Sequence, residues 1–392
     1  MKRVITAVLA TVVLASASLP AAAGEPAYGF KLGGYIKADA SLDNARIYPG
    51  DYRIWVVDEE EKNNAFYLTA NETRLGFDFW WDQENYKTIA KIEFDFYGGG
   101  PATNRSNPMM RHAYVKLEAD NWALLFGQTW DIISPLNPKT VNYSVQWGQG
   151  NIGYRRPQMR FTFKVKPGEE STIKLDAGIS RTIGLDLDGN GIDDGADAGL
   201  PAFQGRIGFG APLGENGKIA IGVSSHYGIE KYTDLDTDDM DTPSWSINGD
   251  LAIKANKRIA LLGEFFMGEN LNQYLGGILQ GVDPLGNPVA SMGGWGLIQL
   301  KATDKALFNV GYGFDDPDDG EWKAPEDGET YTLRDLNSEA FGNIMYSLTS
   351  NVSLMFELAY MQTKYMYMTD GVSTTEDFDA MRFQFAVKAA IK

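Results

Sequence analysis

Residues 186–197 have the spacing of a calcium-binding loop of the EF-hand type. Oxygen ligands fall at positions 1, 3, 5, 7, 9 and 12 of such a loop, which here are Asp186, Asp188, Asn190, Ile192 (through its carbonyl), Asp194 and Asp197. Gly191 at position 6 permits the sharp turn that the loop requires. Because Ca²⁺ prefers several hard oxygen ligands, the sequence predicts a structural calcium site. An acidic turn that is merely solvated is the alternative, since Asp197 stands where a longer glutamate is usual.

Several basic side chains share the polar phase of a run in which polar and apolar residues alternate. Between 154 and 165, Arg156, Arg160 and Lys164 share one phase, while Met159 and Phe161 take the other. Successive side chains of a strand point to opposite faces, so the two sets line opposite faces of a predicted strand. Other predicted strands carry further basic residues on the polar phase: Arg74, Lys116, Arg206 and Arg382. Inside a pore such side chains attract anions, and guanidinium groups bind carboxylates in bidentate geometry.

Carboxylates occupy the same polar phase of the predicted strands. They are Glu72, Asp78, Glu93, Asp95 and Asp176. A mixture of charges across a lumen can create a transverse electric field without selecting one sign of ion. Two interpretations therefore remain, a basic ladder that selects small organic anions and a weakly selective pore.

Catalytic chemistry finds little support in the sequence. The only histidines, His112 and His226, fall on different predicted strands, and the absence of cysteine excludes a thiolate site. Neither a Gly-x-Ser-x-Gly elbow nor a paired-histidine zinc helix occurs. We therefore expect no enzymatic activity and no required cofactor.

The elements that carry these residues form a regular series. From about residue 29 to 392, sixteen runs of about ten residues alternate apolar and polar side chains. Their connectors are alternately short and long, a rule that a transmembrane barrel follows and a soluble sandwich does not. We predict one all-β domain over 24–392, a 16-stranded antiparallel transmembrane β-barrel with short periplasmic turns and long extracellular loops. Such a barrel encloses a lumen wide enough for water.

Two of the long connectors differ from the rest. We expect residues 131–153 to fold inward and narrow the lumen, and an external flap is the alternative. Residues 184–201 form the extracellular loop with the calcium-type motif. The alternation of connectors also predicts a loop before the last strand, 378–391. Aromatic residues near the predicted strand ends indicate two girdles at the lipid boundary: Trp80, Trp81, Trp122, Trp130, Trp245, Trp295, Tyr365 and Tyr367.

Composition indicates where the protein resides and what it contacts. Residues 1–23 have a basic start, a short apolar core and an alanine-rich end, which predict a cleaved secretory signal peptide. The net charge of −17 argues against nucleic-acid binding. We expect the outer membrane of a Gram-negative type of bacterium, with lipids and small hydrophilic solutes as the partners. A secreted, soluble all-β binding or surface protein stabilised by calcium is the competing interpretation.

Three blocks of the sequence resemble the DcaP-like trimeric outer-membrane porins, and residues 73–77 resemble that family's second strand. The blocks are Met110-Arg111-His112-Ala113-Tyr114, Phe126-Gly127-Gln128-Thr129-Trp130 and Arg155-Arg156-Pro157-Gln158-Met159-Arg160. The resemblance implies a sixteen-stranded homotrimeric channel for small, often anionic solutes such as dicarboxylates. It adds Arg111 and Arg155 to the pore candidates, beside Arg74, Arg156 and Arg160. Arg111 nevertheless falls on the lipid-facing phase of its predicted strand, so either it lies at a rim of the barrel or the predicted phase is wrong at that position.

Overall fold

The computed structural model describes residues 27–99, 106–184, 186, 191–232 and 240–391 of the 392-residue chain. Most of the strands pair into one large antiparallel sheet. The strands of this sheet are, in chain order, β1 (Tyr28–Asp43), β4 (Ala65–Thr69), β5 (Arg74–Asp82), β6 (Lys87–Asp95), β7 (Met109–Glu118), β8 (Trp122–Trp130), β9 (Arg155–Val165), β10 (Thr172–Ser180), β11 (Ala202–Leu213), β12 (Gly217–Tyr232), β13 (Met240–Lys254), β14 (Ile259–Glu269), β15 (Ala290–Lys301), β16 (Ala306–Pro317), β17 (Tyr331–Ser347), β18 (Val352–Thr369) and β19 (Val372–Ile391).

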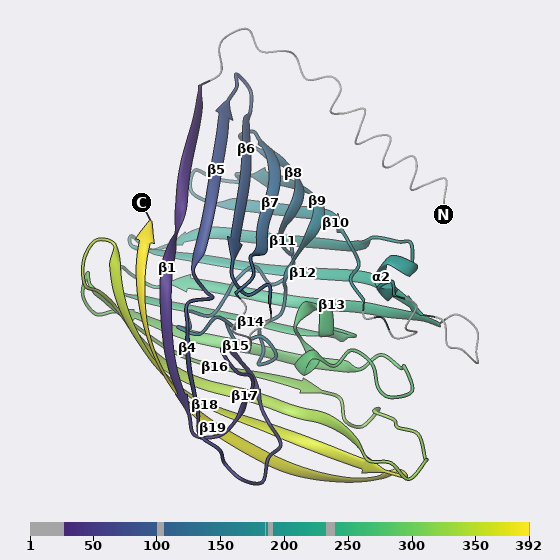
Figure 1. Ribbon diagram of the computed structural model, residues 1–392. Coiled ribbons are helices and arrows are strands. Elements are labelled where there is room, and N and C mark those ends of the chain that lie inside the picture. The colour runs from purple at the N-terminus through teal and green to yellow at the C-terminus, as the bar shows by residue number, and fades with distance from the viewer. Residues whose placement is uncertain (1–26, 100–105, 185, 187–190, 233–239, 392) are drawn as a thin grey trace.

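The sheet closes on itself, because β1 pairs with β19 as well as with β4 and β5 (Figure 1). β4 and β5 pair with successive halves of β1, so the two together form one barrel strand. The seventeen strands of the sheet therefore make a closed barrel of sixteen, as the sequence predicts. The break at 70–73 was not predicted. There Glu72 leaves the wall and contacts both Lys37 and, at 3.1 Å, the hydroxyl of Tyr35.

Helices are short and few among the described residues. They are α2 (Asp194–Asp197) and the 3₁₀ turns η1 (Asn272–Tyr274) and η2 (Gly277–Leu279). In the described part of the chain, no helix is long and apolar enough to cross a membrane.

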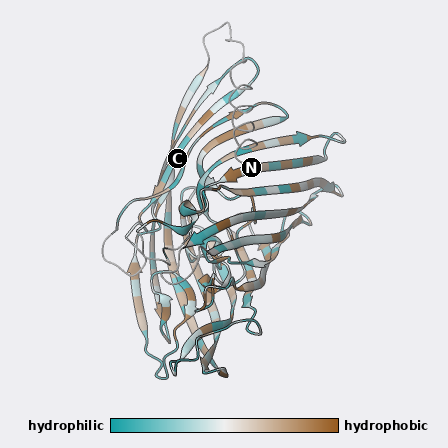
Figure 2. Cartoon of the chain, turned by 90° about the vertical axis from the view of Figure 1, so that its right-hand side faces the viewer, coloured by the Kyte–Doolittle hydropathy of each residue, from teal (hydrophilic) through white to brown (hydrophobic). Residues whose placement is uncertain are grey.

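The alternation that predicts the strands also sorts the two faces of the wall. On β12, Ile221, Val223 and Tyr227 are about half exposed, whereas Ser224 and His226 are buried. Hydrophobic and hydrophilic residues alternate in this way along the strands of Figure 2. Because successive side chains point to opposite faces, the apolar set faces outward and the polar set faces the interior of the barrel.

The predicted loop before the last strand is wrong. β18 and β19 stay in register from Val352 opposite Ala389 to Thr369 opposite Val372, so the hairpin turns tightly at Asp370 and Gly371. Both turn residues have positive φ, 47° and 76°, a conformation that Asp-Gly adopts readily in a two-residue hairpin turn. The exposed, largely polar segment at the start of β19 concealed the continuing strand, although the Asp-Gly pair marked the turn.

The predicted aromatic girdles are wrong for several of their members. Trp295 and Tyr365 are only 4% and 3% exposed, and Trp130 lies 6.4 Å (ring centroids) from Trp147 of the following connector. These rings pack against segments inside the barrel rather than against lipid. Trp81, 37% exposed, does lie on the outward phase. Strand periodicity predicts which residues lie near strand ends, but it does not reveal what the inner side chains contact.

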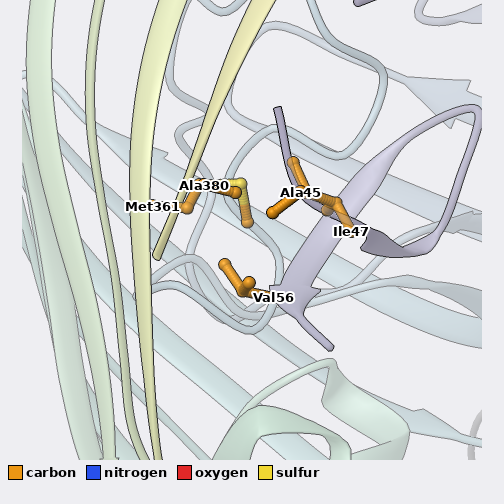
Figure 3. Close-up of a cluster of buried hydrophobic side chains, with 5 residues drawn as sticks. All are labelled: Ala45, Ile47, Val56, Met361 and Ala380. Carbon is orange, nitrogen blue, oxygen red and sulfur yellow. The ribbon is translucent and has the colours of Figure 1, made fainter. Parts of the chain in front are cut away.

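The first long connector, residues 44–64, contains a hairpin that the alternation of side chains does not predict. It consists of β2 (Ile47–Pro49) and β3 (Arg53–Val56). Its buried aliphatic residues pack against the barrel strands β18 and β19, as Figure 3 shows. The residues of this cluster are Ala45, Ile47 and Val56 from the connector and Met361 and Ala380 from the wall. Since both wall residues are fully buried, the hairpin covers the inner face of the barrel.

Candidate functional site

The connector between β8 and β9 crosses the interior of the barrel and is held by side chains of distant strands. The backbone N–H of Leu136 donates to Glu264 of β14 at 2.8 Å, and that of Val141 donates to Glu357 of β18 at 2.7 Å. The carbonyl of Val141 accepts from Lys37 of β1 at 2.6 Å. An irregular segment inside a barrel needs such partners for its polar backbone groups. Inward-facing acidic and basic residues of the wall therefore fix its course.

Arg53 anchors the β2–β3 hairpin through a buried ionic cluster. Its Nη2 donates to Glu339 of β17 at 2.7 Å, and its Nη1 donates to Glu357 of β18 at 2.8 Å. All three side chains are fully buried. Burial by itself lowers the pKa of a guanidinium, but the two carboxylates outweigh that effect and hold the pKa of Arg53 above its ordinary value. Glu357 thus holds both the hairpin and the connector that contains Val141.

A third connector, between β14 and β15, also packs inside the barrel. The ring of Tyr274 stacks on His226 at 3.8 Å between centroids, and Arg156 lies 3.8 Å from the Tyr274 ring centroid. The backbone N–H of Ile278 donates to Asp315 of β16 at 3.2 Å. Three stretches therefore occupy the interior, and we refer to them as the inserted segments: residues 44–64, 131–153 and 270–289.

Most of the predicted pore arginines are paired with carboxylates of the chain itself. Arg382 is fully buried and donates from Nε and Nη2 to the two oxygens of Asp43 at 2.7 and 2.6 Å. Arg206 binds Asp250 in the same way at 3.0 and 2.7 Å. The bidentate geometry expected for a passing anion is therefore present, but an internal carboxylate occupies it.

Two further arginines on the predicted polar phase also contact acidic groups. The Nε of Arg156 lies 2.8 Å from Asp131 at the start of the second inserted segment, and the Nε of Arg74 lies 3.6 Å from Glu93 of β6. Arg156 is only 1% exposed. It therefore acts as an anchor of the inserted segments, whereas its place on the polar phase predicts a pore-lining cation.

The lipid-facing position predicted for Arg111 is wrong. Glu93 pairs with His112 while Phe94 pairs with Met110, so Arg111 is an extra residue in β7. Such a β-bulge reverses the inward and outward phase of the strand. Arg111 consequently points inward, is 3% exposed, and donates to Asp95 at 2.6 Å and to Glu93 at 3.0 Å.

The remaining predicted lysines share one carboxylate. Lys116 and Lys164 lie 2.9 and 3.4 Å from the two oxygens of Glu118. All three side chains are partly exposed, so this pair of contacts adds little stability and leaves one positive charge in excess.

Arg155 and Arg160 differ from the other predicted arginines. Arg160 donates to Gln158 at 2.7 Å and to a backbone carbonyl of Trp130. Arg155, 3% exposed, lies 4.8 and 4.5 Å from the ring centroids of Trp130 and Tyr154. In the described part of the chain, neither guanidinium has a carboxylate within ion-pairing distance, and Nε and Nη1 of Arg155 have no hydrogen-bond partner.

Tyr143 of the second inserted segment joins two of the arginines. Its hydroxyl donates to Asp95 at 3.0 Å and accepts from Arg111 at 3.2 Å, while Nη2 of Arg155 lies 3.5 Å away. Burial raises the pKa of Tyr143 to about 12, so the phenol is neutral at physiological pH. The negative charge of Asp95 therefore balances that of Arg111. The positive charge of Arg155 has no carboxylate to balance it in the described structure.

The structure describes part of the predicted calcium loop. Asp186 accepts a hydrogen bond from the N–H of Gly191 at 3.2 Å, Ile192 is 53% exposed and Asp194 is buried. Asp197 ends the short helix α2. Asp188 and Asn190 lie outside the described residues, as does the predicted signal peptide. The calcium site stays a prediction.

No protein-family model and no curated protein sequence matches the chain. Solved structures do match. The outer membrane channel DcaP of Acinetobacter baumannii is similar with a TM-score of 0.68 at 22% identity, covering 93% of this chain and 97% of that one. The chain has the fold of outer-membrane porins. The resemblance to the DcaP-like porins is thereby confirmed at the level of the fold.

Two other porin-like structures have the same fold at lower identity. An anion-selective porin from Comamonas acidovorans has a TM-score of 0.58 at 11% identity, covering 93% of this chain and 100% of that one. The outer membrane protein OmpT of Vibrio cholerae, in its trimer form, has a TM-score of 0.55 at 12% identity with the same coverage. Similarity at these identities concerns the architecture of the barrel.

Proposed function

We propose that this chain is an outer-membrane porin through which small hydrophilic solutes diffuse. The observation that carries the proposal is a closed barrel of sixteen strands with apolar side chains outside and charged side chains inside. Exposed apolar side chains require a lipid environment, and a charged interior requires water. The fold shared with DcaP and with other porins supports the same function.

The same observation disfavours a secreted, soluble calcium-stabilised protein. A soluble all-β protein buries its apolar face between sheets and exposes its charged face. Here the large apolar residues of one continuous wall are exposed, for example Ile207 at 54%, Val310 at 62% and Phe383 at 55%. That distribution fits a membrane-spanning wall.

The inserted segments form the constriction in this proposal. The segment that follows β8 reaches partners on β14 and β18, and residues 270–289 reach β16, so the inserted segments cross the interior and reduce the cross-section available to a solute. An external flap at 131–153 would not need the buried partners Glu264 and Glu357 that its backbone has. Solutes then pass along the partly exposed inner side chains.

We also propose a preference for small organic anions such as dicarboxylates. Carboxylates of the chain balance the charge of most predicted arginines. The preference for anions therefore depends on the arginines that have no carboxylate partner. Arg155 and Arg160 are the two arginines of the predicted set without such a partner in the described structure. Guanidinium groups in a site of low polarity attract carboxylates strongly.

Swelling of proteoliposomes tests the function. Vesicles with the purified protein should swell in isotonic small sugars, and more quickly in salts of a small dicarboxylate than in salts of a divalent organic cation of equal size. A protein that migrates as a folded, heat-modifiable barrel but leaves the vesicles impermeable to all of these solutes contradicts the proposal. Equal rates for the two salts contradict only the anion preference.

We infer a homotrimer in the bacterial outer membrane, reached after cleavage of residues 1–23. The Vibrio cholerae protein with this fold has a trimer form, and that observation supports a trimer for this chain. Chemical cross-linking in native outer membranes should give a ladder that ends at three subunits, and a species that remains a monomer contradicts the trimer.

A further inference from the structure

A hollow of about 1020 Å³ opens at the end of the barrel where the turns are short. It lies against β10 to β16. Five basic residues line it, and they are Lys218, Lys254, Lys257, Arg258 and Lys301. Among the described residues, two acidic ones share the lining, Glu170 and Glu215. We refer to this hollow and its five basic residues as the basic vestibule.

Two of its lysines face each other across neighbouring strands. Lys218 of β12 pairs directly with Lys254 of β13, and both lie on the inward phase. Like charges directly opposite each other destabilise a sheet. No carboxylate of the described structure forms an ion pair with either lysine. The pair is therefore a local loss of stability without a compensating contact.

A second like-charge pair provides the contrast. Lys164 of β9 faces Lys174 of β10, and each has an acidic neighbour: Glu118 at 3.4 Å from Lys164 and Asp176 at 2.9 Å from Lys174. Acidic neighbours therefore accompany the facing lysines Lys164 and Lys174, but not the facing lysines Lys218 and Lys254 in the described structure.

The remaining basic residues of the vestibule differ in their acidic contacts. The deeper pair Arg206 and Asp250 neutralise each other, and Lys301 pairs at 2.7 Å with Asp304 of the exposed turn, where water weakens the contact. Lys257 and Arg258 occupy the turn between β13 and β14 and are exposed. Clefts lined by one sign of charge concentrate counter-ions.

We propose that the basic vestibule is a binding site for polyvalent oxyanions of the phosphate class, either inorganic or as phosphate esters. The proposal rests on the proposed function, since the vestibule then lies at one mouth of the pore. A polyvalent anion can interact with more than one of the basic groups that line the hollow at once, and lysines bind phosphate as point charges. Because the hollow is open to water, the binding is weak and falls with ionic strength.

Isothermal titration calorimetry on the detergent-solubilised protein tests the site without requiring conduction. Inorganic pyrophosphate and glucose 6-phosphate are titrated at low salt, with acetate as the monovalent comparison. The Lys218→Gln, Lys254→Gln double variant should lose affinity for the bound oxyanion by at least about tenfold. The matched control is Lys166→Gln with Lys305→Gln, which removes two exposed lysines from short turns outside the vestibule.

Binding of pyrophosphate alone assigns the site to inorganic oxyanions, and binding of both ligands includes the esters. Equal affinity in the double variant and the control overturns the proposal, and so does acetate binding as tight as pyrophosphate. If the double variant does not fold, the affinity of the unmodified protein for pyrophosphate is measured at 20 and 500 mM salt instead. Binding to an open cluster of basic residues must weaken steeply at the higher salt concentration, and an unchanged affinity overturns the proposal. A protein that binds pyrophosphate but leaves vesicles impermeable contradicts the proposed pore function and supports the proposed binding site.

Discussion

Replacement of Arg53 by methionine removes the central charge of the cluster that holds the β2–β3 hairpin inside the barrel. The side chain is fully buried and makes hydrogen bonds to Glu339 and Glu357. Methionine has a similar length, so the change removes the charge without leaving a large cavity. Two carboxylates then remain buried near each other with no cation.

Two opposing free energies determine how strongly the substitution destabilises the docked hairpin. Removing one partner of a buried ion pair costs about 3–5 kcal/mol, because the remaining charge stays buried and unpaired. The hairpin keeps the apolar contacts of Ile47 and Val56, and each such buried side chain stabilises the docked state by about 1.5–3 kcal/mol. The two terms are of similar size. We therefore expect a hairpin that docks and undocks, rather than one that is permanently released.

Single-channel recording in planar bilayers measures this exchange. The Arg53→Met channel should flicker between the conductance of the unmodified protein and a higher level, because an undocked hairpin widens the passage. Arg46→Met is the matched control, since Arg46 lies in the same connector but forms an exposed pair with Glu59; exposed pairs contribute about 0–1 kcal/mol. Its recordings should match those of the unmodified protein.

A triple variant separates the ionic effect from misfolding. Arg53→Met combined with Glu339→Gln and Glu357→Gln leaves no buried unpaired charge, so the hairpin should dock more stably and the flicker should decrease. The reasoning is refuted by an Arg53→Met protein that is heat-modifiable and conducts at one steady level equal to that of the unmodified channel.

Three further predictions concern other parts of the molecule. Arg156→Met leaves Asp131 unpaired and should increase open-channel noise, since this pair fixes the start of the second inserted segment; an unchanged noise spectrum would contradict the anchoring. Arg155→Gln should shift the reversal potential toward cations by removing an uncompensated charge, and no shift would exclude that residue from selectivity. Asp186→Ala with Asp188→Ala should abolish calcium binding in equilibrium dialysis, and retained affinity would refute the loop assignment.

Much of the fold follows from alternation alone. Period-two patterning fixes which side chains face outward, and the lengths of the connectors fix closure and order, so the barrel of sixteen strands was predictable. The exceptions are local events that patterning does not encode. The bulge at Arg111 adds one residue to a strand and so reverses its phase, and the turn at Asp370 and Gly371 replaces an expected loop.

The candidate site was less predictable, because it depends on contacts between residues far apart in the sequence. The phase of Arg206 and Arg382 was predicted correctly, but their carboxylate partners lie 44 and 339 residues away. The hairpin that contains Arg53 has one weak sequence signal, the short apolar run 54–57 inside a connector. Only the folded barrel brings that run to Met361 and Ala380.

Current through the unmodified protein in a planar bilayer under a salt gradient tests the central claim most directly. We predict discrete conductance steps from an open, water-filled lumen, with a reversal potential of the sign that chloride-over-potassium permeation gives. Failure of a folded, heat-modifiable barrel to conduct would contradict the porin function, and a reversal potential of the opposite sign would contradict the anion preference.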